Sequence, residues 1–325
     1  MGVYHLMGLG RSPGTVIGPL TYLAHRYSRW EPEDQAFFAG SGEAALRQTG
    51  QSAGDVQALV LFTTREILQG DLPSFDYIEN PPGRVAQGPL RKGGPMKEVL
   101  RAHLRREWPA IAGGRREGVV FWCEVDRRDI RTTYERVARV VAALAGTGGQ
   151  GKEIWVNLTG GNNVMNFALE LAAVLSGDVA RLYYVQAADE RAEKCLRFTA
   201  EDGYWVDLPI LPLGLGRLRR AILEVLTAHG PLPLEDLYAR LRNEYWDLSR
   251  GLDSSETLRR DHLTPLWKAR LIQGTEEGYR PGPQWDLIRP YLQVLEEARS
   301  QNRTLEQLAE EEDWIEREVI PFERP

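Results

Sequence analysis

The chain has 325 residues, of which 42% are hydrophobic and 26% are charged, so it can bury a substantial core and is neither disordered nor fibrous. No apolar run approaches the roughly 20 residues that a membrane span needs. Only two cysteines occur and the formal net charge is −6. We therefore expect a cytoplasmic protein without a membrane partner, a disulfide framework, a metal site or the strongly basic charge typical of nucleic-acid binders.

The first 210 residues alternate short apolar runs with amphipathic stretches. Strands are predicted at 3–7, 58–62, 119–125, 154–158 and 181–185, and long helices at 131–145 and 164–175. This alternation predicts a Rossmann-like α/β domain with a mostly parallel sheet and helices on both faces. Pro19 is expected to break the first helix, and the Pro- and Gly-rich residues 69–94 to form an inserted loop.

A second, mainly helical domain is predicted at 211–290, beginning with a linker at 211–216. Helices expected at 218–228, 234–242 and 254–263, followed by a hairpin-like stretch at 273–281, are typical of a winged helix-turn-helix. Residues 291–325 hold 4 basic and 10 acidic residues. They are predicted to form an acidic tail with helices at 285–299 and 305–319, which either stays solvated or lies against a basic face.

Two loops rich in glycine and small polar residues follow predicted strands. One is Gly8-Leu9-Gly10-Arg11-Ser12-Pro13-Gly14, and the other runs from Asn157 to Met165 as Asn-Leu-Thr-Gly-Gly-Asn-Asn-Val-Met. Such loops expose backbone amides to phosphate at the carboxyl end of an α/β sheet. A nicotinamide dinucleotide is disfavoured, because the second strand ends in Phe62-Thr63-Thr64-Arg65 without an acidic residue for the ribose. The alternative is that both loops are ordinary tight turns.

These two loops, together with Leu61-Phe62-Thr63-Thr64 and Glu124-Val125-Asp126, resemble the CRISPR-associated Rossmann fold (CARF) domain of type III CRISPR systems over about residues 1–200. The resemblance implies a homodimer that binds cyclic oligoadenylate, an antiviral second messenger, across its two-fold axis. It favours the tetra-adenylate, leaves the hexa-adenylate open and implies no cofactor. By position it places ligand contacts at Gly8, Gly10, Arg11, Ser12, Pro13, Thr63, Thr64, Asp126, Asn157, Thr159, Gly160, Gly161, Asn162, Asn163 and Met165. The family often has Thr-Lys where this chain has Asn162-Asn163.

The nuclease motifs that often accompany such a domain are missing from this sequence. A HEPN ribonuclease needs a His five to seven residues after an Arg, and no His here meets that spacing. A PD-(D/E)xK nuclease needs acidic residues and a Lys on adjacent strands, whereas residues 213–325 contain a single lysine, Lys268, on a predicted helix.

Residues 255–272 resemble the recognition helix of bacterial winged-helix regulators. That resemblance places Ser255, Arg259 and Arg260 in the DNA major groove and Arg280, on the wing, at phosphate or in the minor groove. The alternatives are a winged helix that binds protein or is purely structural, and an ordinary solvated helix face at Arg259 and Arg260.

Two hypotheses about function follow. In the first, cyclic oligoadenylate at the dimer interface changes the spacing of two DNA-reading helices, so that the protein is a messenger-controlled transcriptional regulator acting at promoter DNA. In the second, the protein is a CARF ring nuclease or a messenger-buffering protein, and the winged helix is structural. No catalytic residue is assigned, and the sequence leaves ring size and ring cleavage open.

Overall fold

The computed structural model describes residues 2–38, 54–81, 87–146, 152–199, 203–210 and 216–323. The chain forms two compact units. The first unit comprises residues 1–212 and 295–325, and the second comprises residues 213–294. All of the predicted linker except Gly216 lies outside the described residues.

A seven-stranded sheet is the centre of the first unit. Its five parallel strands are β1 (Val3–Gly8), β2 (Val56–Thr63), β5 (Glu117–Glu124), β6 (Glu153–Asn157) and β7 (Val179–Ala187). Two antiparallel edge strands complete it, β11 (Ile315–Pro321) beside β5 and β8 (Gly203–Leu208) beside β7. The predicted mostly parallel α/β sheet is thereby confirmed.

The order of the strands determines where a ligand can enter. Across the sheet they run β11-β5-β2-β1-β6-β7-β8, so the chain moves outward in one direction from β1 and then in the other direction from β6. The carboxyl ends of the two strands at such a reversal border a crevice in which α/β proteins bind ligands. Met7 aligns with Asn157 in the parallel pairing of β1 and β6, so the loops after these two strands begin side by side.

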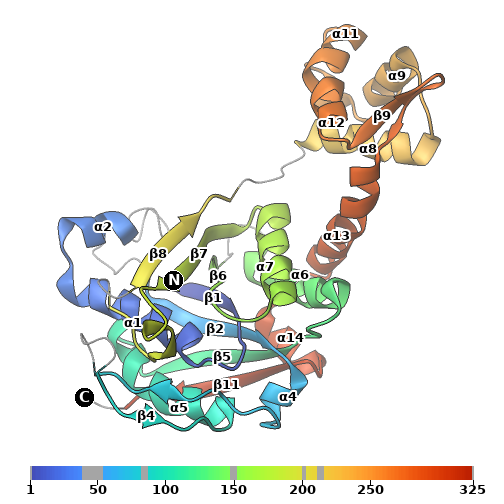
Figure 1. The fold of residues 1–325 in the computed structure, drawn as a ribbon. Helices are drawn as coiled ribbons and strands as arrows, with labels where there is room; N and C mark the ends of the chain where they lie inside the picture. The colour runs from blue at the N-terminus through green and yellow to red at the C-terminus, as the bar shows by residue number, and fades with distance from the viewer. Residues whose placement is uncertain are drawn as a thin grey trace. The chain divides into compact units, whose positions relative to one another are not determined.

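Helices cover both faces of this sheet. Those of the first unit are α1 (Gly14–Arg29), α2 (Pro32–Phe38), α4 (Arg65–Leu68), α5 (Met96–Glu107), α6 (Ile130–Ala145), α7 (Asn163–Ser176) and α14 (Leu305–Glu311), with 3-10 turns at Trp108–Ile111 and Ala192–Lys194. Helices α6 and α7 pack together on one face, and α1 and α5 pack together on the other (Figure 1). Large aromatic side chains fill the interior between the layers, including Trp108, Trp122, Trp155, Tyr134, Tyr183, Phe62 and Phe121.

The predicted break at Pro19 is wrong, because α1 continues through Pro19 to Arg29. Proline has no N–H, so the carbonyl of Thr15, four residues earlier, loses its usual helical donor. The side-chain amide of Asn157 donates to this oxygen at 3.5 Å. A side chain at the end of β6 thus replaces the hydrogen bond that the sequence removes.

The last part of the chain differs from the predicted helical tail. Helix α14 ends at Glu311, and Ile315–Pro321 is strand β11, paired antiparallel with β5. The acidic residues before it suggested a longer helix, but Trp314, Ile315 and Ile320 are buried. Pairing with the free edge of β5 gives the backbone of this segment hydrogen-bond partners and also buries its apolar side chains, which a solvated helix would leave exposed.

The second unit contains helices and one hairpin. Its elements are α8 (Arg217–His229), α9 (Leu234–Glu244), α10 (Trp246–Ser249), α11 (Ser255–Leu258), a π-helical turn (Arg259–Leu263), α12 (Thr264–Lys268), β9 (Ile272–Thr275), β10 (Gly278–Pro281) and the start of α13 (Pro283–Ser300). The π-helical turn precedes Pro265, whose missing N–H frees the carbonyl of Asp261; Arg219 donates to that oxygen at 3.3 Å. The winged helix-turn-helix stays a prediction for this unit.

The predicted loop at 69–94 contains a short hairpin of its own. Strands β3 (Tyr77–Ile78) and β4 (Leu90–Arg91) pair antiparallel, and Ile78 forms a bridge to Cys195. Residues 82–86 lie outside the described residues.

Candidate ligand-binding site

The two glycine loops pack directly against each other. A side chain at Gly160 would collide with the carbonyl oxygen of Gly8 and would approach Thr15 Oγ1 to 2.7 Å. Gly161 has a φ of +81°, a left-handed conformation that glycine adopts at little cost. The glycines at these positions are therefore required for the close approach of the two loops.

The polar side chains of the second loop hold its backbone in place. Asn157 is buried, and its Oδ1 accepts a hydrogen bond from the Thr159 N–H at 2.7 Å. Thr159 Oγ1 accepts from the Val185 N–H of β7 at 2.8 Å. Asn162 caps α7 by accepting from the Met165 N–H at 2.9 Å. These residues give the loop one defined conformation.

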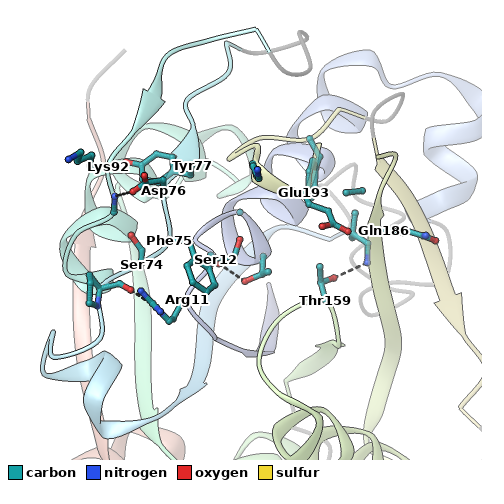
Figure 2. Close-up of a pocket in the computed structure, with 18 of the residues that line it drawn as sticks. Arg11, Ser12, Ser74, Phe75, Asp76, Tyr77, Lys92, Thr159, Gln186 and Glu193 are labelled. Atoms are coloured by element: carbon teal, nitrogen blue, oxygen red, sulfur yellow. Dashed lines mark hydrogen bonds between the residues drawn. The ribbon is translucent and has the colours of Figure 1, made fainter. Parts of the chain in front are cut away.

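A cavity of about 910 Å³ opens next to these loops, on the side of the first loop and β7. Its lining comprises Arg11, Ser12, Gly14, Thr15, Pro73, Ser74, Phe75, Asp76, Tyr77, Lys92, Gly93, Thr159, Tyr184, Val185, Gln186, Ala187, Glu193, Lys194 and Phe198. Figure 2 shows two groups of side chains facing each other, with Arg11 and Phe75 on one side and Thr159, Gln186 and Glu193 on the other. We call this the main cavity. It lies at the reversal point of the strand order, where α/β sheets bind ligands.

Arg11 and Phe75 form a braced pair in the wall of the main cavity. Arg11 Nε donates to the Pro73 carbonyl at 2.8 Å, and the Phe75 N–H donates to the Arg11 carbonyl at 2.7 Å. The guanidinium carbon lies 4.2 Å from the centre of the Phe75 ring. Although it is fixed in this way, Phe75 remains 54% exposed. A preorganised aromatic face is thus available to a flat ligand group.

The charge of the main cavity favours an anion. Three cations, Arg11, Lys92 and Lys194, line it, and within the described residues none of the three forms an ion pair with a carboxylate. Two acids are also present. The Asp76 carboxylate accepts a hydrogen bond from the Gly93 N–H at 2.8 Å, so part of its hydrogen-bonding capacity is used within the cavity wall. Glu193 is exposed. Phosphate groups are the ligands that Lys and Arg side chains commonly bind.

Buried contacts hold the inserted segment in position as a wall of the main cavity. Asn80 and Arg197 share three hydrogen bonds. The Arg197 N–H donates to Asn80 Oδ1 at 3.0 Å, Asn80 Nδ2 donates to the Arg197 carbonyl at 2.9 Å, and the Arg197 guanidinium donates to the Asn80 carbonyl. Arg197 Nε also donates to Glu107 at 2.9 Å. Burial lowers the pKa of His103 to about 4, so this ring is neutral and bonds to the Tyr77 hydroxyl at 3.2 Å.

The predicted ligand residues of the first unit are divided among different places. Arg11, Ser12 and Thr159 line the main cavity. Thr64 and Asp126 line a separate cavity of about 540 Å³, which also contains Arg65, Arg127, Arg128 and Arg136. The others line neither of these two cavities: Gly8, Gly10, Pro13, Thr63, Asn157, Gly160, Gly161, Asn162, Asn163 and Met165. Thr63 is fully buried, and its hydroxyl donates to the Leu9 carbonyl at 2.8 Å.

Sequence reasoning missed much of the main cavity. Phe75, Asp76, Tyr77, Lys92 and Gly93 come from the segment that was expected to be only a loop. Gln186 and Lys194 come from the end of β7 and the turn after it. The Pro- and Gly-rich composition of 69–94 was the available signal, because long loops in compact domains are often functional.

The predicted DNA-binding residues of the second unit have partners within the unit. Arg259 is paired with Glu256 at 2.7 Å and Arg260 with Asp261 at 2.6 Å, and each hydrogen bond raises the pKa of the arginine. Ser255 Oγ donates to a carboxylate oxygen of Glu235 at 2.6 Å. A nucleic acid would have to replace these contacts.

Within the part of the chain that the structure describes, no group of three or more His, Cys, Asp or Glu side chains is placed to hold a metal ion. Within the same residues, no helix has both the length and the apolar character needed to cross a membrane.

No protein-family model matches this chain. An uncharacterised protein of Archaeoglobus fulgidus is 24% identical over 262 residues, which are 75% of this chain and 79% of that protein. Among solved structures, Csm6 of Enterococcus italicus bound to cyclic hexa-2'-fluoro-hexa-dAMP is similar with a TM-score of 0.39 and 13% identity, over 93% of this chain. The match spans 64% of the Csm6 chain.

Proposed function

We propose that the first unit binds a cyclic oligoadenylate in the main cavity and that the protein is a homodimeric, CARF-like sensor of this messenger. The observation that carries the proposal is the main cavity itself. It lies where the strand order reverses, next to two glycine loops, and combines cations with an exposed aromatic ring. Its volume of about 910 Å³ is at the upper end of the range of roughly 300–1,000 Å³ for small-molecule sites.

The lining of the main cavity fits the chemical groups of an oligoadenylate. Arg11, Lys92 and Lys194 supply positive charge for phosphodiester groups. Phe75 supplies a ring on which adenine can stack. Ser12 also lines the main cavity, and its hydroxyl group can hydrogen-bond to ribose hydroxyls.

An exposed apolar side chain on α7 supports the proposal of a dimer. Phe167 is 57% exposed, and Val164, Leu171 and Val174 are only half-buried on the same helix. This helix begins at Asn163, directly after the second glycine loop. A second copy packed on α7 would cover these apolar side chains and give the two-fold dimer that a symmetric ring requires.

For the second unit we propose ligand-controlled nucleic-acid binding, which makes the protein a messenger-dependent regulator of transcription. The support is the predicted winged helix-turn-helix pattern, together with three helical segments and a hairpin in the order that this pattern requires. The cyclic ligand would act by favouring one arrangement of the dimer.

The test is titration of the full chain with cyclic tri-, tetra- and hexa-adenylate by calorimetry, with chromatography of the ligand after incubation. We expect cyclic tetra-adenylate to bind and to be recovered intact. Arg11→Gln should weaken binding, whereas Arg317→Gln, an exposed arginine on β11, should leave it unchanged. If none of the three rings binds the wild type, the proposal is wrong. Turnover of a bound ring would instead identify the main cavity as the active site of a ring nuclease.

A further inference from the structure

One surface of the second unit combines an exposed tryptophan with unpaired positive charge. Trp267, near the end of α12, is 58% exposed. It lines two adjacent cavities, one of about 360 Å³ on the side of Arg259 and one of about 480 Å³ on the side of Arg270. We call Trp267, Lys268, Arg270 and Arg280 the Trp267 surface.

The cations of the Trp267 surface keep their charge available. Lys268 and Arg270 are exposed, and among the described residues neither forms an ion pair with a carboxylate. With the Gln273 amide oriented to satisfy its contacts, its oxygen accepts from Arg280 Nε at 2.7 Å and Nη2 at 3.0 Å. This partner is neutral, so it orients the guanidinium of Arg280 without cancelling its charge.

The nearest acidic residues of the hairpin lie at its far end. Ile272 pairs with Pro281 at the open end, next to Arg270, and Thr275 pairs with Gly278 at the turn. Glu276 and Glu277 form that turn. Over three residues of extended strand this is a separation of about 10 Å, which is close to the screening length at moderate salt. The base of the hairpin is therefore the positively charged end.

The backbone of Arg270 supports a role for its side chain. Arg270 has a φ of +58°, directly after the C-cap residue Ala269 of α12. Glycine is strongly preferred at this left-handed position after a helix, because other residues are strained there. A long cationic side chain kept at a strained position is the kind of outlier that marks functional surfaces.

We propose that the Trp267 surface binds single-stranded nucleic acid, with one base stacked on Trp267 and neighbouring phosphates at Lys268, Arg270 and Arg280. An aromatic face flanked by uncompensated cations is how proteins hold an unpaired strand without reading its sequence. In a duplex the bases are already stacked and give Trp267 no face to bind. This assignment is an alternative to the duplex contact of a winged helix. It moves the nucleic-acid contact away from Arg259 and Arg260, whose charges are already paired, to an unpaired strand. It holds whether or not the first unit binds a cyclic nucleotide.

The test uses the full chain and a fluorescently labelled 20-nucleotide strand of mixed sequence, as DNA and as RNA, with the matched duplex for comparison. Anisotropy should show tighter binding of the single strand at ~50 mM salt, where electrostatic contacts are strongest. Trp267→Ala should weaken binding about 5- to 150-fold, the range that corresponds to loss of one stacked base. The double variant Arg259→Gln, Arg260→Gln lies beside the Trp267 surface and should weaken binding less than Trp267→Ala does. Arg317→Gln, an exposed arginine on β11 in the first unit, is the matched control and should stay within about twofold of the wild type.

Arg270→Gly separates a binding role from a structural one. Glycine relieves the left-handed strain, so the melting temperature should rise, while removal of the cation should weaken binding and lower the slope of log affinity against log salt by about 0.7. A structural role would move stability and affinity in the same direction.

Three results would overturn the assignment. They are a duplex bound as tightly as the single strand, unchanged affinity in Trp267→Ala, and a larger loss in the Arg259, Arg260 double variant than in Trp267→Ala. A Trp267→Ala variant that binds the strand normally but no longer captures a protein partner would assign the surface to protein binding instead. Calorimetry with cyclic tetra-adenylate on the same variants keeps failure of this inference distinct from failure of the first unit to bind its ligand.

Discussion

Replacement of Phe75 by leucine tests how the main cavity recognises a base. Leucine keeps an apolar side chain but removes the flat ring that lies 4.2 Å from the Arg11 guanidinium. Stacking of a base on an aromatic side chain contributes about 1–3 kcal/mol. The change should therefore weaken binding of cyclic tetra-adenylate by about 5- to 150-fold for each main cavity that holds a stacked base.

The fold should tolerate this substitution, because Phe75 is 54% exposed and the backbone bonds of its segment to Arg11 do not involve its ring. Calorimetry of Phe75→Leu, Phe75→Tyr and the wild type measures the effect, and the tyrosine variant should retain most of the affinity. Leu90→Ala is the matched control. Leu90 is 64% exposed on the same inserted segment and is not among the residues that line the main cavity.

A specific pattern of results would refute the stacking argument. If Arg11→Gln abolishes binding while Phe75→Leu binds as tightly as the wild type, the main cavity holds phosphate and the ring has no part in recognition. If Leu90→Ala weakens binding as much as Phe75→Leu does, the effect comes from a general disturbance of the inserted segment.

Three further predictions concern stability and assembly. Gly160→Ala should lower the free energy of unfolding in urea by about 1–3 kcal/mol, because the added carbon would overpack the contact between the two glycine loops. Gly177→Ala is the control: Gly177 has a φ of +70° and no atom within 4 Å of an added Cβ, so this change should lower the free energy of unfolding by only about 1 kcal/mol. Equal losses in the two variants would contradict the packing argument. Burial lowers the pKa of His5 to about 3, so as the pH falls below about 6.5 this histidine is protonated in the unfolded chain before it is protonated in the folded one. The free energy of unfolding should therefore decrease from pH 6.5 towards pH 3, with a contribution from His5 of about 2 kcal/mol at pH 5. If the melting temperature depends on pH in the same way in the wild type and in His5→Asn, His5 is not responsible. In light scattering, Phe167→Asp should appear as a monomer where the wild type is a dimer. Its melting temperature should change little, because the Phe167 side chain is exposed in the single chain. An unchanged dimer would exclude α7 as the interface.

The parallel strands were predictable because each is nearly continuous in apolar residues. A strand that is covered on both faces has no polar alternation, and β2 and β6 show this clearly. The edge strands were missed for the opposite reason. In β11 only Ile315 and Ile320 are fully buried, and the charged residues between them suggested a helix. Its identity as a strand depends on the free edge of β5, which is nearly 200 residues away in the sequence.

The candidate site shows the same division. The sequence alone located the two glycine loops, because a glycine-rich turn between an apolar strand and an amphipathic helix is a local pattern. It also contained the i, i+3 spacing of Glu256 and Arg259, from which their ion pair follows.

Only the tertiary structure decided which side chains surround the main cavity and which cations remain unpaired. Phe75 reaches Arg11 across more than 60 residues of chain, and Arg197 holds Asn80 across 117. Trp267 has the same apolar character as the buried tryptophans of this chain, yet it is exposed. Local propensities act over a few residues, whereas burial, cavity shape and charge compensation depend on which distant segments meet. The sequence alone therefore identified the five parallel strands and the two glycine loops, and the fold determined which side chains meet around the main cavity.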